Sequence, residues 1–562
     1  MTYENHHARD ACTDTFQYGS RIGHSDVADV ECLDDTGIAL FHDWAIPVGV
    51  DHSGALFHFS GAGRVRPYLD GRFRKPTHAS HADPKVVGGF QVLIESAAPL
   101  IATAATLIGL AAAVHALFNK RDPRSALSWC AVCLMAPFIG ALLYGLFGIN
   151  RVVKRVRRLQ LGERRAPQPQ DGLSPTEHEQ IGHLAGLIQL SAALQQWPLT
   201  EGNRVTPLHN GEAAYPDMLA AIEQARIRIS LGAYIFDGDG VGLEFIEALV
   251  DAARRGVDVR VLIDGVGAWY SWPRATGRLR RRGVPVRVFA PPKLLPPTLQ
   301  INLRNHRKIL VTDGEIGFAG GLNIGDRHRV ATGSGQADVH FRFEGPVVGQ
   351  LEEVFFEDWE RAGGSRYYPL AVQPEPLPNQ DARCRVLTDS PSEDMDKLTV
   401  VMIGAIALAR QRVLIMNPYF LPPRELIGAL VSAALRGVEV AIILPARSNL
   451  PFVHWATRNM LWEVLRWGVK VYYQPEPFNH SKLFVVDEDY VQVGSANLDP
   501  RSLRLNFELM VEVFDRELAH GLAAHCLAAR GRSREVTLDE VDGRAFSERL
   551  RDAIAWLFSP YL

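Results

Sequence analysis

Two stretches of the sequence repeat one pattern of residues that could do chemistry. Each has a histidine, a lysine two positions later, an aspartate after four more residues and an asparagine at the same later offset: His306, Lys308, Asp313 and Asn323, then His480, Lys482, Asp487 and Asn497. Alternate side chains of a strand share one face, so we expect each histidine beside its lysine. That neighbour disfavours protonation of both groups. The imidazole then stays nucleophilic, and the ammonium can bind a phosphoryl oxygen.

The residues around each motif predict its local structure. Apolar runs at 309–311 and 483–486 are typical of buried strands, and both aspartates lie in turn sequences. Two unrelated histidines at strand ends would be the alternative. Repetition of the whole pattern, asparagine included, argues against it.

The two stretches resemble the paired His-Lys-Asp motifs of the phospholipase D superfamily. Two flanking segments are similar to bacterial cardiolipin synthases: Arg304–Lys308 and Arg501–Glu508. The resemblance runs from about Val92 to the C-terminus and leaves out the first eighty-odd residues. It implies phosphodiester exchange through a covalent phosphohistidine, with no cofactor and no metal.

The resemblance also implies a role for each site residue. His306 would be the nucleophile, and His480 the acid and base for the two alcohols. Four side chains would hold the non-bridging oxygens: Lys308, Lys482, Asn323 and Asn497. Glu508 would orient the second histidine and Asp338 the first, although a solvated loop aspartate is an alternative for Asp338. Asp313 and Asp487 complete the catalytic motifs and would set loop geometry without touching the substrate.

A longer repeat surrounds the motifs. A helix end, a glycine and a strand occur at matching places, as in Arg255–Val259 and Arg436–Val440. Strands alternate with helices, so each copy is expected to be an α/β sandwich. By resemblance, a pseudo-dyad relates the two phospholipase D-like repeats and brings both motifs into one site.

Two long apolar stretches precede the repeats, at about 96–118 and 126–149, with no charged residue in either. Each is long enough to span a bilayer, so we expect a two-helix transmembrane hairpin. Basic residues precede the first stretch and follow the second, as at 151–158, which places both ends in the cytoplasm. The prediction is a multi-pass protein of the bacterial inner membrane with a cytoplasmic catalytic domain. Two buried helices of a soluble core are the alternative.

These patterns divide the chain. We expect a disordered tail at 1–85, the transmembrane hairpin at 90–150, a basic linker at 151–200, and phospholipase D-like domains at 201–370 and 383–562. The last residues, 544–562, predict an amphipathic helix that either faces the membrane or packs on the core.

Composition limits the function classes. The net charge of −3 over 562 residues gives no bulk attraction to nucleic acid. The predicted function joins two phosphatidylglycerols into cardiolipin with release of glycerol. Alternatives are a phospholipase D-type hydrolase, another phosphatidyltransferase, a nuclease, which the membrane segment disfavours, and a non-catalytic membrane scaffold. The oligomeric state is left open.

Overall fold

The computed structural model describes residues 84–120, 123–149, 182–291, 303–332, 335–366, 369–370, 374–391 and 396–559. The chain forms two compact units, Met1–Ser96 and Ala97–Leu562, and only the start of one helix is described in the first. Nearly all of the tail expected at 1–85, and residues 151–181 of the expected linker, lie outside the described residues.

The first apolar stretch is a helix, α1 (Pro84–Asn119), and within it Ala97–Asn119 is long and apolar enough to cross a membrane. The second stretch was expected to be one helix, and that expectation is wrong. It consists of α2 (Pro123–Met135), α3 (Pro137–Leu143) and a π-helical turn, η1 (Tyr144–Gly148). Pro137 causes the break, because proline has no N–H and its ring clashes with the preceding turn. The described residues therefore contain one candidate span.

Small residues let α1 pack closely against α2 and α3. A Cβ atom on Gly109 would lie 2.5 Å from the carbonyl oxygen of Cys133. Cys133 is buried beside Ala113, Ala116 and Tyr144. The Cys130-x-x-Cys133 pair thus acts as small packing side chains, as its place in an apolar run suggests.

The rest of the structure contains two copies of one strand arrangement. The first copy has β1 (Thr200–His209), β2 (Arg228–Ala233), β3 (Asp258–Asp264), β4 (Val286–Phe289), β6 (Ile309–Thr312), β7 (Ile316–Gly320) and β8 (Val339–Glu344). The second has β9 (Ala382–Asp389), β10 (Arg412–Met416), β11 (Glu439–Pro445), β12 (Lys470–Gln474), β13 (Leu483–Val486), β14 (Tyr490–Gly494) and β15 (Asn506–Phe514). A short strand, β16 (Arg534–Val536), extends the second copy.

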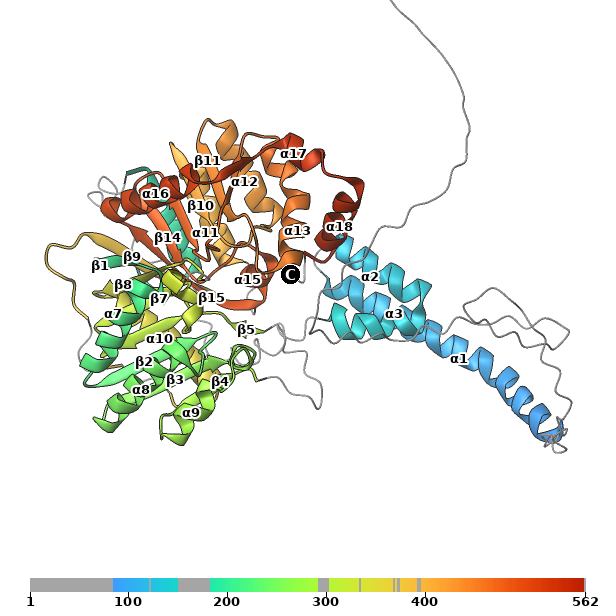
Figure 1. Ribbon diagram of the computed structural model, residues 1–562. Helices are drawn as coiled ribbons and strands as arrows, with labels where there is room; N and C mark the ends of the chain where they lie inside the picture. The colour runs from blue at the N-terminus through green and yellow to red at the C-terminus, as the bar shows by residue number, and fades with distance from the viewer. Residues whose placement is uncertain are drawn as a thin grey trace, which may run out of the picture. The chain divides into compact units, whose positions relative to one another are not determined.

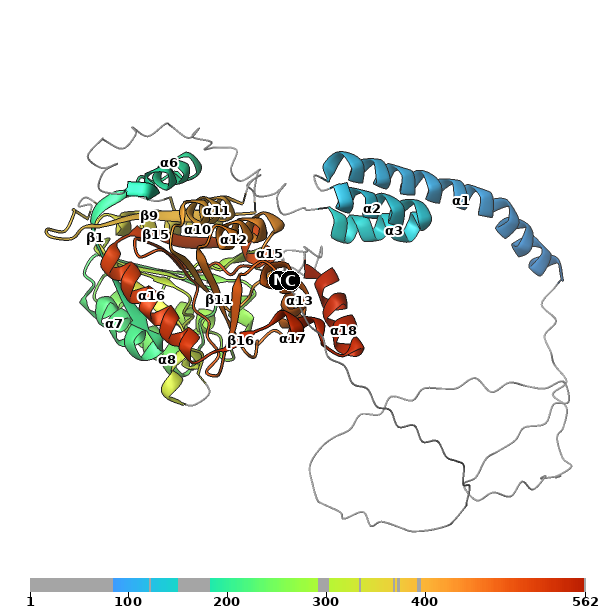
Figure 2. The ribbon, with the colours of Figure 1, turned by 90° about the horizontal axis from the view of Figure 1, so that it is seen from above.

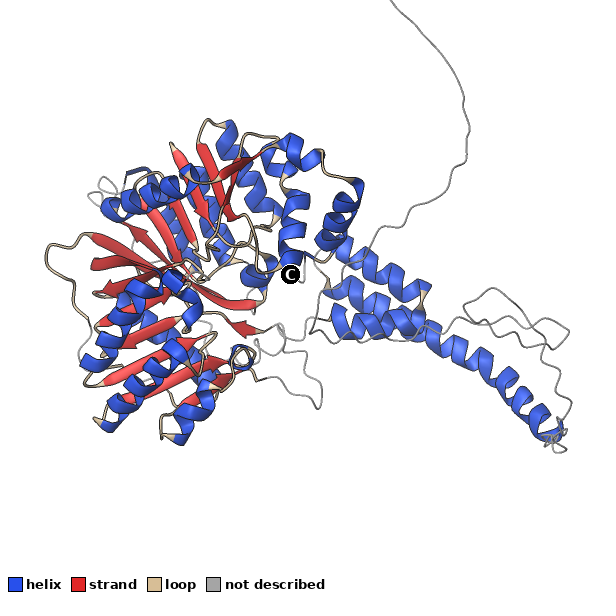
Figure 3. Ribbon diagram, in the orientation of Figure 1, coloured by secondary structure: helices blue, strands red, loops and turns tan. Residues whose placement is uncertain are grey.

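The strands join into one sheet with a pseudo-dyad at its middle. The order is β16-β12-β11-β10-β13-β14-β15-β9-β1-β8-β7-β6-β2-β3-β4, and β1 pairs with β9 at the centre. Outward from that pair, both copies run through equivalent strands in the same sequence. Figure 3 shows the strands of the two copies meeting at the middle of the molecule.

Helices cover both faces of each copy (Figures 1 and 2). In the first copy, α7 (Asn210–Gln224), α8 (Gly240–Arg254) and α9 (Ala275–Arg281) bury one core with the sheet. In the second, α11 (Lys397–Leu408), α12 (Arg424–Leu435) and α13 (Pro451–Met460) bury another. A third cluster extends from α10 (Val347–Arg361) to α16 (Arg516–Gly531) through both copies. The two copies therefore share a core and form one body.

The end of the expected linker belongs to this body. A 3₁₀ turn, η2 (Gly182–Leu184), leads into α6 (Ala185–Leu194). Leu187 and Ile188 are buried in the core of the second copy, although the first copy follows them in the chain. Residues 182–199 are thus part of the folded body, although they lie within the segment expected as a basic linker at 151–200.

The C-terminal helix, α18 (Phe546–Leu557), has features of both predicted alternatives. Ala555 and Asp552 are buried on the side that packs against α13. The opposite side is apolar and exposed, through Phe546, Leu550, Ile554 and Leu557.

Candidate active site

Each His-Lys-Asp motif is held by backbone contacts to the other copy. The short strand β5 (Arg304–Asn305) pairs with β15, and the His306 N–H donates to the Phe507 carbonyl at 3.0 Å. In the same way Ala337 bridges Asn479, and the His480 N–H donates to the Ala337 carbonyl at 2.7 Å. The sheet order brings these segments together, because β8 and β15 flank the central pair. Both motifs therefore lie in one site between the copies.

A buried carboxylate contacts each histidine, and the pairing is the reverse of the expected one. Nδ1 of His306 lies 3.1 Å from Glu508, and Nδ1 of His480 lies 2.9 Å from Asp338. The two acids occupy equivalent positions. Asp338 lies two residues before His340, which pairs with Gly320, and Glu508 lies two residues before Met510, which pairs with the matching Gly494. Asp338 is fully buried, so it is not a solvated loop residue. Each acid reaches across the pseudo-dyad and orients the histidine of the other copy.

Glu508 is the better stabilised of the two carboxylates. The Ser495 hydroxyl donates to it at 2.6 Å, and the Asn506 amide at 3.0 Å. Burial raises the pKa of Glu508, but contact with His306 and the charge of Lys308 outweigh burial and hold that pKa below its ordinary value. Burial raises the pKa of Asp338, and the Lys482 charge only partly opposes this. The anionic form is thus favoured at Glu508 more than at Asp338.

Burial keeps both histidines neutral. It lowers the pKa of His306 to about 4. Lys308 lowers this pKa further, and Glu508 only partly opposes the two effects. Burial also lowers the pKa of His480 well below its ordinary value, assisted by Lys482 and Lys308. Each lysine lowers the pKa of the histidines of both copies, so the charges of the two motifs act on one another within one site.

Both lysines are buried, and among the described residues no carboxylate is hydrogen-bonded to either ammonium group. Nζ of Lys308 donates to the His306 carbonyl at 2.7 Å, and Nζ of Lys482 donates to the His480 carbonyl. Burial lowers the pKa of Lys308 to about 7 and that of Lys482 to about 8. Two cations held in one buried site favour an anion between them.

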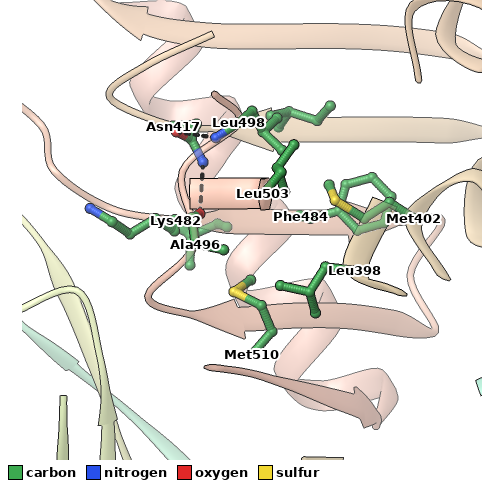
Figure 4. Close-up of a pocket in the computed structure, with 11 residues that line it drawn as sticks. Leu398, Met402, Asn417, Lys482, Phe484, Ala496, Leu498, Leu503 and Met510 are labelled. Carbon is green, nitrogen blue, oxygen red and sulfur yellow. Dashed lines mark hydrogen bonds between the residues drawn. The ribbon is translucent and has the colours of Figure 1, made fainter. Parts of the chain in front are cut away.

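The two asparagines lie in equivalent buried loops. Oδ1 of Asn323 accepts from the Ile235 N–H at 3.2 Å. The Asn497 loop is braced by Asn417, whose amide group bonds Ala496 and Leu498, the two neighbours of Asn497 (Figure 4). Within the described part of the chain, the side-chain oxygen of Asn497 is buried with no hydrogen-bond partner.

Asp313 and Asp487 hold the turns, as expected, and lie away from the reacting groups. The Asp313 carboxylate accepts three backbone N–H bonds of 2.8 Å from Arg226, Ile227 and Arg228. Asp487 does the same for 410–412 and also contacts His183 at 3.1 Å. Both aspartates have positive φ, at 53° and 52°. Both aspartates belong to the repeated motif, but their contacts are structural.

The structure adds site residues that sequence reasoning missed. The Tyr234 ring packs edge-on against His306, with centroids 5.0 Å apart, and Nζ of Lys308 lies 5.4 Å from its centre. His328 is buried 6.0 Å from the His480 ring and accepts from the Asn323 N–H. No spacing pattern identifies these residues. Tyr234 could have been noticed only through its place in Ala233–Phe236, which matches Asn417–Phe420 in the second copy.

A small apolar cavity lies behind Lys482 (Figure 4). Its lining includes Leu398, Met402, Phe484 and Met510, and the ammonium of Lys482 points away from it. The volume of about 10 Å³ is close to the space of one water molecule. This cavity is too small for an acyl chain.

No group of three or more His, Cys, Asp or Glu side chains that could hold a metal ion occurs among the described residues. The positive charge beside the histidines comes from the two lysines. These groups suit covalent transfer of a phosphoryl group between oxygens.

Comparison with known proteins identifies the family. The model of the PLD-like domain of cardiolipin synthase matches residues 218–359 and 402–527, and that of the phospholipase D-nuclease N-terminal region matches 107–148. Cardiolipin synthase A of Pseudomonas putida (strain F1) is 33% identical over 469 residues, covering 81% of this chain and 96% of the relative. The chain belongs to the cardiolipin synthase family.

Other relatives agree with this membership. The major cardiolipin synthase of Bacillus subtilis (strain 168) is 31% identical, over 81% of this chain and 98% of its own. A crystal structure of phosphatidylserine synthase from Haemophilus influenzae superposes with a TM-score of 0.51 at 16% identity, covering 67% of this chain and all of that one. The second likeness concerns the fold alone. The predicted family and the predicted class, a membrane-associated phosphatidyltransferase, are confirmed.

Proposed function

We propose that the protein joins two phosphatidylglycerols into cardiolipin and releases glycerol, through a phosphatidyl group carried on His306. The observation that carries this proposal is the crossed arrangement of two neutral histidines, each bonded at Nδ1 to a buried carboxylate of the other copy. Two such histidines suit a reaction that needs a nucleophile and a separate proton carrier. Family membership favours phosphatidylglycerol as donor and acceptor.

The reaction proceeds in two displacements. The anionic phosphate of the bound donor favours a proton on His480, which is neutral in the empty site. Nε2 of His306 attacks the phosphorus of the donor, the bond from phosphorus to the glycerol oxygen breaks, and His480 gives that oxygen its proton. In the second step, His480 takes a proton from a hydroxyl of the acceptor. The resulting oxygen attacks phosphorus, and the bond from phosphorus to nitrogen breaks.

The environments of the two carboxylates support this division of labour. Glu508 favours its anionic form, and so stabilises the positive charge on His306 when its other nitrogen binds phosphorus. Asp338 has a raised pKa and holds a proton on His480 less strongly, which suits a group that must release it. Lys308, Lys482, Asn323 and Asn497 would hold the non-bridging oxygens.

Transfer to lipid competes with transfer to water, and burial favours the lipid. The two histidines are each 8% exposed, and the lysines are more buried still. A site this enclosed limits access of bulk water to the intermediate. At a bilayer surface, neighbouring lipid headgroups have a high effective concentration. These conditions favour the transferase over the hydrolase.

We also propose how the chain meets the membrane. The apolar helix Ala97–Asn119 spans the inner membrane, α3 folds back against α2 without a second crossing, and the catalytic body lies on the cytoplasmic side. The basic residues at 151–158 support this orientation. The domains at 201–370 and 383–562 then form the catalytic body, and the exposed apolar side of α18 suits contact with lipid.

The proposed reaction is tested with purified full-length protein in vesicles of phosphatidylglycerol alone. We expect cardiolipin and free glycerol in equal amounts. Phosphatidic acid as the main product would make the protein a hydrolase. Cardiolipin that forms only after a second phospholipid is added would show a different donor and acceptor pair.

A further inference from the structure

The pseudo-dyad relates two arginines that have different surroundings. Each stands four positions after an asparagine of the site: Arg327 after Asn323, and Arg501 after Asn497. Arg327 lies in a 3₁₀ turn (Asp326–His328), and Arg501 in the short helix α15 (Pro500–Arg504). Because the loops match residue for residue, the two arginines can be compared directly.

In the first copy the arginine is neutralised. Nη2 of Arg327 donates to both oxygens of Asp237, at 2.9 and 2.7 Å. The Asp237 N–H donates to the Ile324 carbonyl at 2.9 Å, which fixes the carboxylate beside the loop. Hydrogen bonds between two charged groups are stronger than those between neutral groups. Arg327 therefore braces its loop and has little charge to offer a ligand.

In the second copy the partner is missing. The Leu421 N–H donates to the Leu498 carbonyl at 2.6 Å, so Leu421 stands where Asp237 stands in the first copy. Its side chain is apolar and cannot accept a hydrogen bond. Within the described part of the chain, the Arg501 guanidinium has no hydrogen bond or ion pair. The nearby Asp499 is buried and caps α15 by accepting from the Ser502 N–H at 2.7 Å, and the Arg501 charge opposes the rise in its pKa that burial causes, although the two side chains form no ion pair.

Arg501 lies in α15, directly after the Asn497 loop, and its charge acts on groups of both copies. Its charge opposes the rise in pKa that burial causes at the hydroxyls of Tyr234 and Tyr419. Tyr234 packs on His306, as described above, and also lies against Tyr270, with ring centroids 6.3 Å apart. The Tyr419 hydroxyl contacts Asn449 at 2.7 Å. The Arg501 charge thus reaches Tyr234, the ring that packs on His306, and a cation close to the reacting histidine is what an anionic oxygen would need.

We propose that Arg501 binds the non-reacting phosphodiester of the acceptor lipid. This inference rests on the proposed function, in which two phosphodiesters must meet at one pair of histidines. The lysines and asparagines hold the phosphoryl group that is transferred. The acceptor brings a second phosphate, one glycerol away from its attacking hydroxyl, and that phosphate needs a cation of its own. A half-buried arginine without an ion pair supplies that charge, with a planar group that suits phosphate. The two copies differ because Leu421 stands where the first copy has Asp237. The second copy therefore offers the acceptor phosphate an arginine that the first copy does not.

The test compares two acceptors that share one donor. Full-length wild-type protein and the Arg501→Gln variant are given phosphatidylglycerol vesicles with radiolabelled glycerol. Cardiolipin measures transfer to an acceptor with a phosphate, and labelled phosphatidylglycerol measures transfer to one without. Both products need the same donor step. Arg504→Gln is the matched control, since Arg504 lies on the same helix and pairs with Asp396 at 3.0 Å on the surface.

We expect R501Q to lower cardiolipin formation about 10- to 100-fold, the loss of one charge-assisted contact, while glycerol exchange stays within about twofold of wild type. R504Q should leave both products unchanged. Equal losses of cardiolipin and labelled phosphatidylglycerol in R501Q would mean that Arg501 acts on the donor or supports the fold, and would overturn the inference. Wild-type amounts of both products would overturn it as well. Wild-type protein that exchanges glycerol without making cardiolipin would instead refute the proposed function.

Discussion

Replacement of Glu508 by glutamine tests the crossed pairing of acids and histidines. Glutamine has nearly the same shape and can still meet Ser495 and Asn506, so the change removes the charge beside His306 and little else. Two unit charges about 4 Å apart at an effective dielectric constant of about 20 interact by about 4 kcal/mol. His306 becomes positive when it attacks phosphorus, so this stabilisation is lost in the transition state. We expect formation of the phosphohistidine to slow about 1000-fold.

Asp338→Asn changes the acid at the equivalent position beside His480. The choice of leaving group separates its effect from that of Glu508→Gln. His480 is proposed to protonate the departing alcohol, a step that p-nitrophenol does not need. In single-turnover experiments with a phosphatidyl p-nitrophenyl ester, D338N should form the intermediate at nearly the wild-type rate, whereas E508Q should remain slow. With phosphatidylglycerol, both variants should be slow.

The reasoning has clear points of failure. Rescue of E508Q rather than D338N by the activated ester would make His480 the nucleophile. Wild-type rates for E508Q with both substrates would show that the 3.1 Å contact to His306 has no catalytic role. Thermal unfolding of each variant, compared with wild type, shows whether a slow rate comes from a damaged fold.

Four further outcomes are expected. Lys308, with its pKa of about 7, must carry a charge to bind phosphate, so kcat/KM should be highest below pH 7 and fall as the pH rises through that value. Lys308→Arg should move this fall to higher pH. A fall at the same pH in the variant would contradict the role of Lys308. Asp313→Ala loses three backbone hydrogen bonds, so it should lower the free energy of unfolding, measured in urea, by about 1–3 kcal/mol and leave kcat nearly unchanged. A large loss of kcat without a loss of stability would instead make the aspartate catalytic. Activity should survive excess chelator, since the lysines supply the charge, and a loss restored by Mg²⁺ or Zn²⁺ would refute this. Leu557→Glu should reduce turnover in vesicles but not in detergent micelles, with Ile227→Glu, at a similarly exposed position, as control; equal turnover in vesicles would exclude lipid contact by α18.

The sequence by itself determined the parts of this protein that local pattern controls. The repeated spacing of histidine, lysine, aspartate and asparagine predicted the chemistry and the family, because those positions are fixed along single strands and turns. Asp313 and Asp487 were expected to set loop geometry, and each accepts backbone N–H bonds close to it in the fold. The apolar stretch at 96–118 forms the candidate span that its length and composition predict.

Only the tertiary structure decided which acid serves which histidine. Asp338 lies 142 residues from His480, and Glu508 lies 202 residues from His306, so no local pattern relates them. The pairing follows from the meeting of β1 and β9 at the centre of the sheet, which sets β8 and β15 opposite the motifs of the other copy. Packing likewise placed α6 in the core of the second copy. The contrast between Asp237 and Leu421 also became visible only when matching backbone bonds identified them as equivalent residues.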